Sequence, residues 1–322
     1  MSHPFETLPT TPTSEELIDK AFSRAARAGR AKQGHDAQQS MLQTAANILS
    51  DNLENVVQAW PDFDDLDPFY RELADAEHGV DELRQHLSEV TWASRKTSDI
   101  RDEYQSRLRN VDADGARKLR KQAFARLADV TREVSGGLSA LADARQALRK
   151  LPDIKPDEPV IVVAGYPNVG KSSFVNSVTR ADNEIAAYPF TTTQIHVGHV
   201  ERDHIRYQLV DTPGLLDRPP ADRNEIEAQA VSALAHLADA VLVMVDASGE
   251  CGFPIDVQLD LRDDIASRFG DAPVLTVANK ADRSRDVEAD HYMSVTEDDN
   301  VEEVLTAAID AVGYEPELPF EE

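Results

Sequence analysis

The pattern of apolar and polar positions divides the chain into two halves of different character. Up to about residue 150, apolar residues recur every three or four positions, and no strand-like alternation interrupts them. Such stripes are typical of a helical core rather than of a ligand site. The first half therefore predicts an all-helical bundle, with helices expected over roughly residues 14–28, 36–60, 67–90, 97–134 and 136–150.

Two local signals support these helices. Thr13-Ser14-Glu15-Glu16 predicts a capping box at the start of the first helix, because the threonine and the last glutamate can each bond the other's backbone N–H. Pro68 suits the first position of the third helix, and Gly79 can break that helix.

From Val160 onward, short apolar runs alternate with helical patterns, which is typical of an α/β sheet. The second and third expected strands are separated by only four residues, so they must pair antiparallel, whereas the others leave room for right-handed helical crossovers. The expected strands cover residues 160–164, 195–200, 205–210, 240–245, 273–278 and 291–295. The expected helices cover residues 171–179, 224–237, 256–269 and 301–311.

A short polar connector with Pro152, Pro156 and Pro159 separates the two halves and marks a domain boundary. We therefore expect a helical bundle domain over residues 1–155 and an α/β domain over residues 156–322. At 322 residues, each domain is large enough to have its own core.

The first expected strand runs into Gly165-Tyr166-Pro167-Asn168-Val169-Gly170-Lys171-Ser172, which matches the phosphate-loop pattern G-x-x-x-x-G-K-[ST]. The glycines let backbone N–H groups turn toward phosphate oxygens, and the helix beginning near Lys171 adds its positive N-terminal dipole. Lys171 is expected to reach the β- and γ-phosphates, and the Ser172 hydroxyl to complete the coordination of Mg²⁺. The alternative is a chance glycine turn, but the strand and helix that the motif requires are both expected here.

Two further motifs stand where expected strands end, the edge at which open α/β sheets bind ligands. In Asp211-Thr212-Pro213-Gly214 the carboxylate can hold Mg²⁺ through water, and the Gly214 N–H can sense a γ-phosphate. In Asn279-Lys280-Ala281-Asp282 the last carboxylate can accept hydrogen bonds from N1–H and the 2-amino group, which guanine has and adenine lacks. Asn279 would support the loop, and the stem of Lys280 would lie along the base.

Two weaker signals complete the set. Ser294-Val295, after the last expected strand, could present a backbone N–H to guanine O6. Phe190-Thr191-Thr192-Thr193 lies before the second strand, where a hydroxyl could join Mg²⁺ only when the γ-phosphate is present. In this order, the motifs predict a site for GTP or GDP with Mg²⁺.

The composition limits which bonds and sites the chain can form and where it is expected to work. Cys251 is the single cysteine, so an intrachain disulfide is impossible, and the nine histidines show no metal-ligand spacing. There is no run of 18 apolar residues and no signal segment, which leads us to expect a cytoplasmic protein without a membrane partner.

The charge is strongly acidic and uneven. The formal net charge is −26, from 59 acidic and 33 basic residues, of which only nine are lysines. Residues 1–155 carry a net −4 and residues 156–322 a net −22, which suggests different partners for the two halves. Such a surface suggests a protein that works in concentrated salt, where self-repulsion is screened. The alternative is an ordinary acidic cytosolic protein.

The stretch from Arg95 to Arg132 is locally basic. A surface that contacts a phosphate backbone is one interpretation of this stretch. A solvated helix face with ion pairs between neighbouring turns is the other, and the sequence does not choose between them.

At these motifs the chain resembles the translation-factor-related P-loop GTPases and, within them, the Obg/HflX-like group. The phosphate loop, Tyr188-Pro189-Phe190-Thr191-Thr192 and the extension of the third motif to Leu215-Leu216 carry this resemblance. The run from Pro12 to Phe22, followed by a helical domain of about 150 residues, is similar to the Nog (nucleolar G-protein) family, here an archaeal member. The fold implied is a helical bundle followed by a Ras-like GTPase domain, a mostly parallel sheet with one antiparallel edge pair.

The resemblance implies roles for individual residues. Gly165 through Ser173 would bind phosphates, Ser172 and Thr192 would hold Mg²⁺ directly, and Asn279, Lys280, Asp282 and Ser294 would read guanine. Val295 stands where the family usually has alanine, so this base-contact motif departs from the family pattern.

Two positions bear on the rate of hydrolysis. Leu215 follows the Asp-x-x-Gly motif, where a water-orienting glutamine often stands, so intrinsic hydrolysis should be slow. Asn168 resembles the asparagine with which some related GTPases hold K⁺ beside the phosphates, so K⁺ should stimulate turnover over Na⁺. The alternative is that Asn168 only bonds within its own loop.

The family implies a role in maturing the large ribosomal subunit, with both domains contacting rRNA rather than DNA. The chain ends near residue 322, without the long C-terminal extension of eukaryotic Nog proteins. We expect a monomeric GTP switch in which Lys171, Thr192 and Gly214 act on the γ-phosphate. The alternatives are an RNA-binding assembly factor with GTP as a structural ligand, and a GTPase that docks a protein through its helical domain. A membrane-linked GTPase is disfavoured because lipidation motifs are lacking.

Overall fold

The structure separates the chain into two compact units. The computed structural model describes residues 3–179, 184–187, 194–213, 215–217, 225–270 and 272–314. One unit, the helical unit, consists of Phe5–Asp65 and His78–Arg149. The other, the α/β unit, consists of Met1–Pro4, Leu66–Glu77 and Lys150–Glu322.

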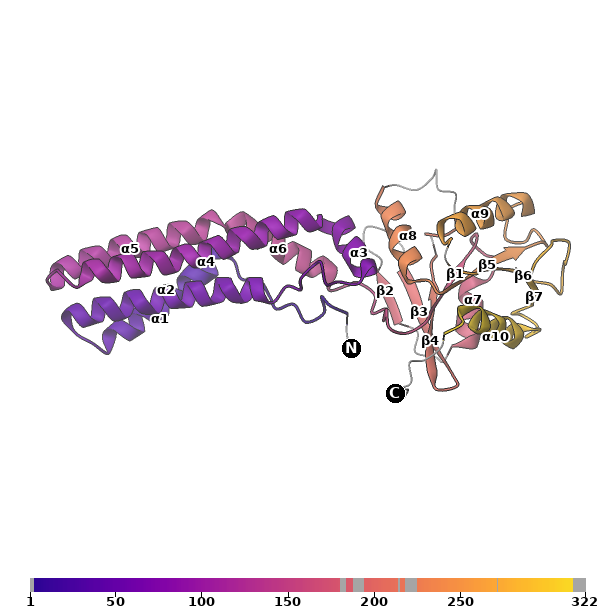
Figure 1. Ribbon diagram of the computed structural model, residues 1–322, viewed down its shortest axis with the longest axis horizontal. Coiled ribbons are helices and arrows are strands. Elements are labelled where there is room, and N and C mark those ends of the chain that lie inside the picture. The colour runs from indigo at the N-terminus through magenta and orange to yellow at the C-terminus, as the bar shows by residue number, and fades with distance from the viewer. Residues whose placement is uncertain are drawn as a thin grey trace, which may run out of the picture. The chain divides into compact units, whose positions relative to one another are not determined.

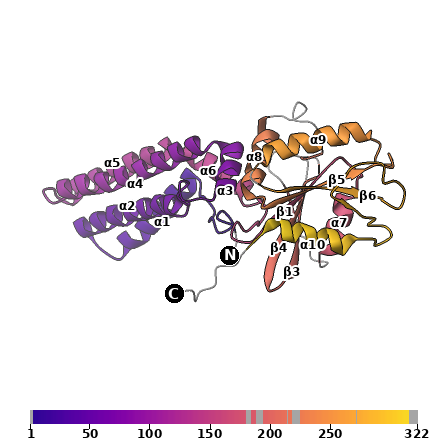
Figure 2. The same ribbon diagram turned by 45° about the vertical axis from the view of Figure 1, so that its right-hand side comes forward.

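Long helices that run side by side form the helical unit (Figures 1 and 2). Their apolar faces meet in a core that includes Leu42, Leu49, Leu53 and Ile100, each at most 1% exposed. Burying each such side chain stabilises the fold by about 1.5–3 kcal/mol. The helices are α1 (Ser14–Arg30), α2 (Gly34–Gln58), α4 (Val80–Leu108), α5 (Ala113–Glu133) and α6 (Ser135–Leu148).

Helix boundaries follow the capping signals more closely than the apolar stripes. The capping box is confirmed, because Thr13 Oγ1 accepts from Glu16 N at 3.3 Å and Glu16 Oε2 accepts from Thr13 N at 2.8 Å. The single helix expected over residues 97–134 is wrong. A turn at residues 109–112 divides it, and the Asp112 side chain caps α5 by accepting from Gly115 N at 2.8 Å.

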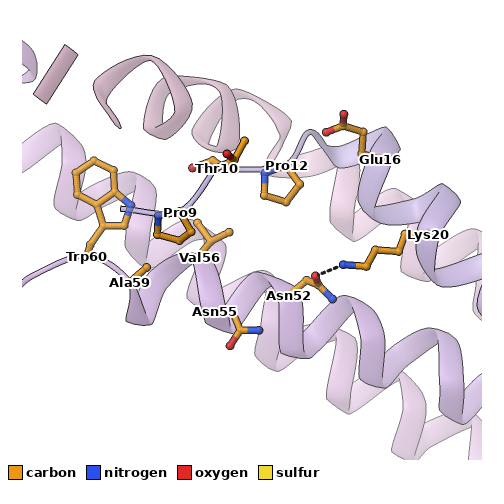
Figure 3. Close-up of a pocket in the computed structure, with 11 residues that line it drawn as sticks. Pro9, Thr10, Pro12, Glu16, Lys20, Asn52, Asn55, Val56, Ala59 and Trp60 are labelled. Carbon is orange, nitrogen blue, oxygen red and sulfur yellow. Dashed lines mark hydrogen bonds between the residues drawn. The ribbon is translucent and has the colours of Figure 1, made fainter. Parts of the chain in front are cut away.

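The helical unit contains a pocket of about 310 Å³ between the extended residues 9–12 and helices α1 and α2 (Figure 3). Trp60 lines one part of it, and Lys20 Nζ donates to Asn52 Oδ1 at 2.8 Å in another. None of the motifs predicted to bind nucleotide contributes to its lining.

Helix α3 (Pro68–His78) lies between helical-unit segments in the sequence, yet it packs in the α/β unit. The Tyr70 hydroxyl donates to Ile154 O at 2.6 Å and to Pro152 O at 3.2 Å. Glu72 Oε1 lies 2.9 Å from Nε2 of His236 at the end of α8. The helix is thereby fixed to the connector and to a helix of the α/β unit.

A seven-stranded sheet forms the centre of the α/β unit, in the order β2-β3-β4-β1-β5-β6-β7. Every residue of β1 and β5 is buried, as expected for central parallel strands covered on both faces. The strands are β1 (Val160–Ala164), β2 (Glu184–Ala187), β3 (Gln194–Arg202), β4 (Ile205–Asp211), β5 (Ala240–Asp246), β6 (Val274–Asn279) and β7 (His291–Tyr292).

The expected antiparallel pair is confirmed as β3 and β4, and the remainder of the sheet from β4 to β7 is parallel. Strand β2 adds a further antiparallel pairing with β3, which the sequence did not predict. Helices α7 (Lys171–Val178) and α10 (Val301–Val312) cover one face, and α8 (Glu225–Leu237) and α9 (Ile255–Arg268) cover the other (Figures 1 and 2). Among the described residues, no helix has the length and apolar character needed to span a membrane.

Candidate nucleotide-binding site

The sequence motifs come together at one edge of the sheet. They follow the carboxyl ends of β1, β4, β6 and β7, and these strands lie within the continuous run β4-β1-β5-β6-β7. In an open α/β sheet this edge is where ligands bind.

The phosphate loop connects β1 to α7 and has a backbone that only glycine tolerates at two positions. Gly165 has φ +132° and Gly170 has φ +107°, both outside the range that residues with a side chain commonly adopt. A Cβ on Gly165 would lie 2.3 Å from Met244 O, and one on Gly170 would lie 2.2 Å from Asn279 Nδ2. The loop is therefore wedged between β5 and the end of β6.

Lys171 begins α7, and its side chain folds back into the phosphate loop. Nζ donates to Gly165 O at 2.7 Å and to Tyr166 O at 3.0 Å, and the residue is buried. Burial lowers the pKa of Lys171, while Asp211 and Asp217 oppose this shift. The ammonium is thus held where a phosphate in the loop would meet it.

Ser172 and Asp211 form a pair of oxygen ligands suited to Mg²⁺. The Ser172 hydroxyl donates to Asp211 Oδ2, and Asp211 is fully buried. Burial raises the pKa of Asp211, and the hydrogen bond from Ser172 and the nearby Lys171 oppose this shift. In the described part of the chain, Asp211 Oδ1 has no hydrogen-bond partner. A buried carboxylate oxygen without a donor, beside a hydroxyl, fits a hard cation that prefers oxygen ligands.

Two parts of the predicted site lie outside the described residues. These are Thr192, with its neighbours from Tyr188 to Thr193, and Gly214. Their roles toward Mg²⁺ and the γ-phosphate stay predictions. Leu215, directly after Gly214, is 2% exposed, and its apolar side chain is buried in the α/β unit.

Asn279, at the end of β6, joins three of the loops. Its Nδ2 donates to Val169 O at 2.7 Å, and its Oδ1 accepts from Val295 N at 3.2 Å. The residue is buried. The amide therefore holds the phosphate loop and the Ser294-Val295 loop against the start of the base-recognition motif, which is the supporting part of its predicted role.

The remaining base-recognition residues differ in how they are placed. Asp282 is exposed at the end of its motif. Ser294 is buried, and its N–H donates to Asp299 O at 3.0 Å, while the Val295 N–H is engaged by Asn279. Both backbone N–H groups thus have protein partners here, so a contact from either to guanine O6 stays a prediction. Tyr166 is also buried, with its ring packed on Phe253 at 4.3 Å between centroids.

The loop after β5 contributes a residue that the sequence motifs did not include. Asp246, the last residue of β5, is fully buried, and its Oδ2 lies 2.6 Å from Lys280 Nζ. Its signal in the sequence was weak, since a single aspartate at the end of an apolar run is common. Only the pairing of β5 with β6 brings it to Lys280.

Comparisons with known proteins agree with this geometry. Residues 5–155 match the family profile described as the NOG1 N-terminal helical domain, and residues 160–280 match the one described as a 50S ribosome-binding GTPase. Protein MJ1408 of Methanocaldococcus jannaschii is 35% identical over 291 residues, which cover 87% of this chain and 81% of that protein. The nucleolar GTP-binding protein 1 of Drosophila melanogaster is 35% identical over 269 residues, covering 82% of this chain and 41% of that protein.

The chain belongs to the NOG1 family of GTPases. The same nucleolar protein from Caenorhabditis elegans is 34% identical over 86% of this chain and 42% of its own length. The chain thus spans less than half the length of these two nucleolar relatives. A solved structure of a Plasmodium falciparum protein described as nucleolar GTP-binding protein 1 has a TM-score of 0.46 and 32% identity, over 51% of this chain and 90% of that one.

Membership of the NOG1 family confirms the resemblance drawn from the motifs. It also confirms the fold class, a helical region followed by a GTPase domain, and it makes residues 160–280 a GTPase domain that binds guanine nucleotide.

Proposed function

We propose that this protein is a GTP-dependent switch with slow intrinsic hydrolysis that acts in the assembly of the large ribosomal subunit. The main observation behind the proposal is that one chain contains both a NOG1-type helical domain and a GTPase domain. In the GTPase domain, the phosphate loop, Asp211 and Asn279 meet at one edge of the sheet. The description of the second profile as a ribosome-binding GTPase and the nucleolar names of the relatives support the ribosomal partner.

The described residues supply most of what a nucleotide complex needs. The phosphate loop would bind the phosphates through backbone N–H groups, with the Lys171 ammonium neutralising their charge. Ser172 and Asp211 would hold Mg²⁺, which supplies charge neutralisation at the β- and γ-phosphates when bound. Asp282 would select guanine through the two donors that adenine lacks.

Slow intrinsic hydrolysis is the consequence of Leu215. Fast hydrolysis needs a group that orients the attacking water and another that stabilises charge on the γ-phosphate. A buried leucine side chain can do neither. Activation would therefore come from outside the domain or from an ion bound beside the phosphates.

The pairing of charges in the helical unit supports an RNA partner. Within the basic stretch, Arg101, Arg107, Arg126 and Arg132 form ion pairs with carboxylates. Seven other cations have no ion pair among the described residues, and one of them, Arg120, donates to the neutral Gln38 instead: Arg95, Lys96, Arg109, Arg117, Lys118, Arg120 and Lys121. These unpaired charges could neutralise phosphates of an RNA backbone. The paired arginines agree with the solvated-face interpretation, and the cations without an ion pair leave room for the phosphate-contact interpretation.

The proposal is tested by co-sedimentation of the purified protein with isolated large and small ribosomal subunits in high KCl. We expect binding to large-subunit particles that depends on whether GDP or a non-hydrolysable GTP analogue is loaded. A variant with Arg109, Arg117, Lys118 and Lys121 changed to glutamine should bind the subunit more weakly while binding nucleotide normally.

Other outcomes would favour the alternatives. Undetectable turnover even with large subunits present would favour an assembly factor that uses GTP as a structural ligand. Absence of binding to mature and precursor subunits in both nucleotide states would contradict the ribosomal role, and the helical domain would then be interpreted as a protein-docking module.

A further inference from the structure

The carboxylate of Asp246 lies beneath the base-recognition motif and is saturated with hydrogen bonds. Asp246 pairs with Asn279 in the register of β5 and β6, so the last residues of these two strands lie side by side. The carboxylate accepts from Ser248 N at 2.9 Å, from the Ser248 hydroxyl, from Cys251 N at 2.9 Å and from Lys280 Nζ at 2.6 Å. A buried carboxylate with this many donors is fixed in position.

Lys280 is the donor that connects this carboxylate to guanine recognition. Its backbone has φ +56°, a left-handed conformation that costs free energy in a residue with a side chain. Its side chain reaches Asp246 and is 19% exposed. The ion pair therefore helps to hold the turn in which Asp282 stands two residues later.

The same network extends toward the phosphate loop. Gln258 of α9 accepts from Asp246 N at 2.8 Å, and its Nε2 donates to Asp246 O at 3.1 Å and to Phe253 O at 2.8 Å. The ring of Phe253 packs on Tyr166 of the phosphate loop. The loop after β5 thus lies between the two parts of the site that would hold the base and the phosphates.

We infer that Asp246 is a positioning residue for guanine recognition, acting through Lys280. Its buried carboxylate fixes the Lys280 ammonium, and with it the Asn279-Lys280-Ala281-Asp282 turn, before nucleotide arrives. A site that is already ordered loses less conformational entropy on binding, and its donors and acceptors keep the geometry that distinguishes guanine from other bases. The inference rests on the proposed binding of GTP and GDP at this site.

A double-mutant cycle tests the inference. The variants are Asp246→Asn, Lys280→Met and the double variant, and the measured quantities are the Kd values for GDP and for inosine diphosphate, which lacks the 2-amino group. Each single change should weaken GDP binding about tenfold or more and should lower the preference for GDP over inosine diphosphate. The double variant should bind GDP no more weakly than Lys280→Met alone, because Asp246 acts through Lys280.

A matched control separates positioning from general charge effects. Glu250 lies 3.9 Å from Lys280 and forms its shorter ion pair with the exposed Arg283, so Glu250→Gln removes a neighbouring charge without touching the buried pair. It should leave both Kd values within about twofold of the wild type, as expected for an exposed ion pair.

The outcomes distinguish this inference from the proposed function. If the wild type fails to bind GDP, the proposed function itself is wrong. If the wild type binds GDP but the two single changes are additive, or leave the GDP preference unaltered while lowering only the melting temperature, Asp246 is merely structural. If Asp246→Asn does not fold, Lys280→Met alone decides, because an unchanged GDP preference in that variant contradicts the inference.

Discussion

Asn168 occupies an exposed position in the phosphate loop with φ +63°. Within the described part of the chain its side-chain amide has no hydrogen-bond partner, so the alternative of a bond within its own loop finds no support. An amide oxygen on an exposed residue of the phosphate loop is a suitable ligand for a monovalent cation. Such an ion would place positive charge near the γ-phosphate, the task of an arginine finger.

We therefore expect GTP turnover to be at least about tenfold faster in KCl than in NaCl, a small part of what an arginine finger supplies. Both salts are compared at equal ionic strength, with phosphate release as the measurement. Asn168→Ala should reduce the difference between the salts while retaining GDP binding. Identical wild-type turnover rates in KCl and NaCl would contradict stimulation by K⁺.

Gly170 shows how tightly the phosphate loop approaches the base-recognition motif. In Gly170→Ala the new methyl group would meet the Asn279 amide at 2.2 Å, on a backbone with φ +107°. We expect GDP affinity to fall at least about tenfold and the free energy of unfolding to fall by about 1–3 kcal/mol, a typical cost of such strain. Isothermal titration and urea denaturation measure the two effects.

Gly313→Ala is the matched control for this change. Here too the alanine would have to adopt a left-handed backbone, at φ +60°, but none of the described residues lies within 4 Å of the added Cβ. It should cost some stability and leave GDP affinity unchanged. Equal loss of GDP affinity in both variants would show that the contact between Gly170 and Asn279 has no specific role.

His199, on β3, gives the fold a pH dependence. Burial, followed by the charges of Arg206 and Lys155, lowers the pKa of His199 from 6.5 to about 4. Between pH 6.5 and 4 the unfolded chain therefore binds more protons than the folded protein, so stability falls as the pH is lowered through this window. Because His199 is only partly buried, we expect its share of the loss to be only about 1 kcal/mol.

Urea denaturation at pH 7 and pH 5 checks this expectation. The His199→Gln variant should lose less stability than the wild type between the two pH values. His204 is exposed in the turn between β3 and β4, so the control variant His204→Gln should lose as much stability between pH 7 and pH 5 as the wild type does. If His199→Gln loses as much stability between pH 7 and pH 5 as the wild type does, groups other than His199 cause the acid sensitivity.

Some residues of the site could be predicted from sequence and others could not. Lys171, Ser172 and Asp211 were predictable because a phosphate loop and an Asp-x-x-Gly motif require those side chains at fixed spacing. The role of Asn279 in joining three loops, and the pair of Asp246 with Lys280, depend on the register of β5 and β6. That register is a property of the folded sheet, so local pattern does not contain it.

At the scale of elements, the predictions were best where the pattern was strong. The long apolar stripes gave the helices, and the short buried runs gave six of the seven strands. Strand β2 (Glu184–Ala187) has only four residues and depends on pairing with β3, so its own sequence is too short to show alternation. The turn at residues 109–112 was missed because apolar spacing continues across it.

Helix α3 is the element whose place the sequence did not indicate. Its apolar stripe is like that of its neighbours, but the side chain of Tyr70 fixes it to the connector after α6. We expect Tyr70→Phe to lower the free energy of unfolding of the α/β unit by about 1–2 kcal/mol, because two buried carbonyls lose a donor. The same change should make amide hydrogen exchange in α3 faster.

Tyr314→Phe is the control for this prediction, because Tyr314 is 40% exposed and the same hydroxyl is removed at the surface. It should leave both measurements near the wild-type values. If Tyr70→Phe also leaves them unchanged, the hydroxyl is not what fixes α3 to the connector.

At the scale of the whole molecule, the charge divides unevenly between two parts with different proposed partners. The second half carries a net −22 and contains the nucleotide site, whereas the first half carries only −4 and contains the unpaired cations. A strongly acidic half repels a phosphate backbone, so RNA contacts should be concentrated on the helical unit. High salt weakens the contacts between cations and RNA phosphates, which lowers RNA affinity. It also weakens the repulsion among the protein's own acidic groups, which stabilises the fold.

The net charge of −26 leads to the prediction that salt stabilises the fold. Screening shortens the range of charge repulsion from about 10 Å at 0.1 M to about 3 Å at 1 M, which favours the compact state over the expanded one. We expect the melting temperature to rise by about 5 °C or more between 0.1 and 2 M KCl, equivalent to a stabilisation of about 1–2 kcal/mol. NaCl should give nearly the same rise, because screening depends on ionic strength, whereas only KCl should accelerate turnover if Asn168 binds K⁺. A protein that is fully folded and active at low ionic strength, with no gain from molar KCl, would instead be an ordinary acidic protein.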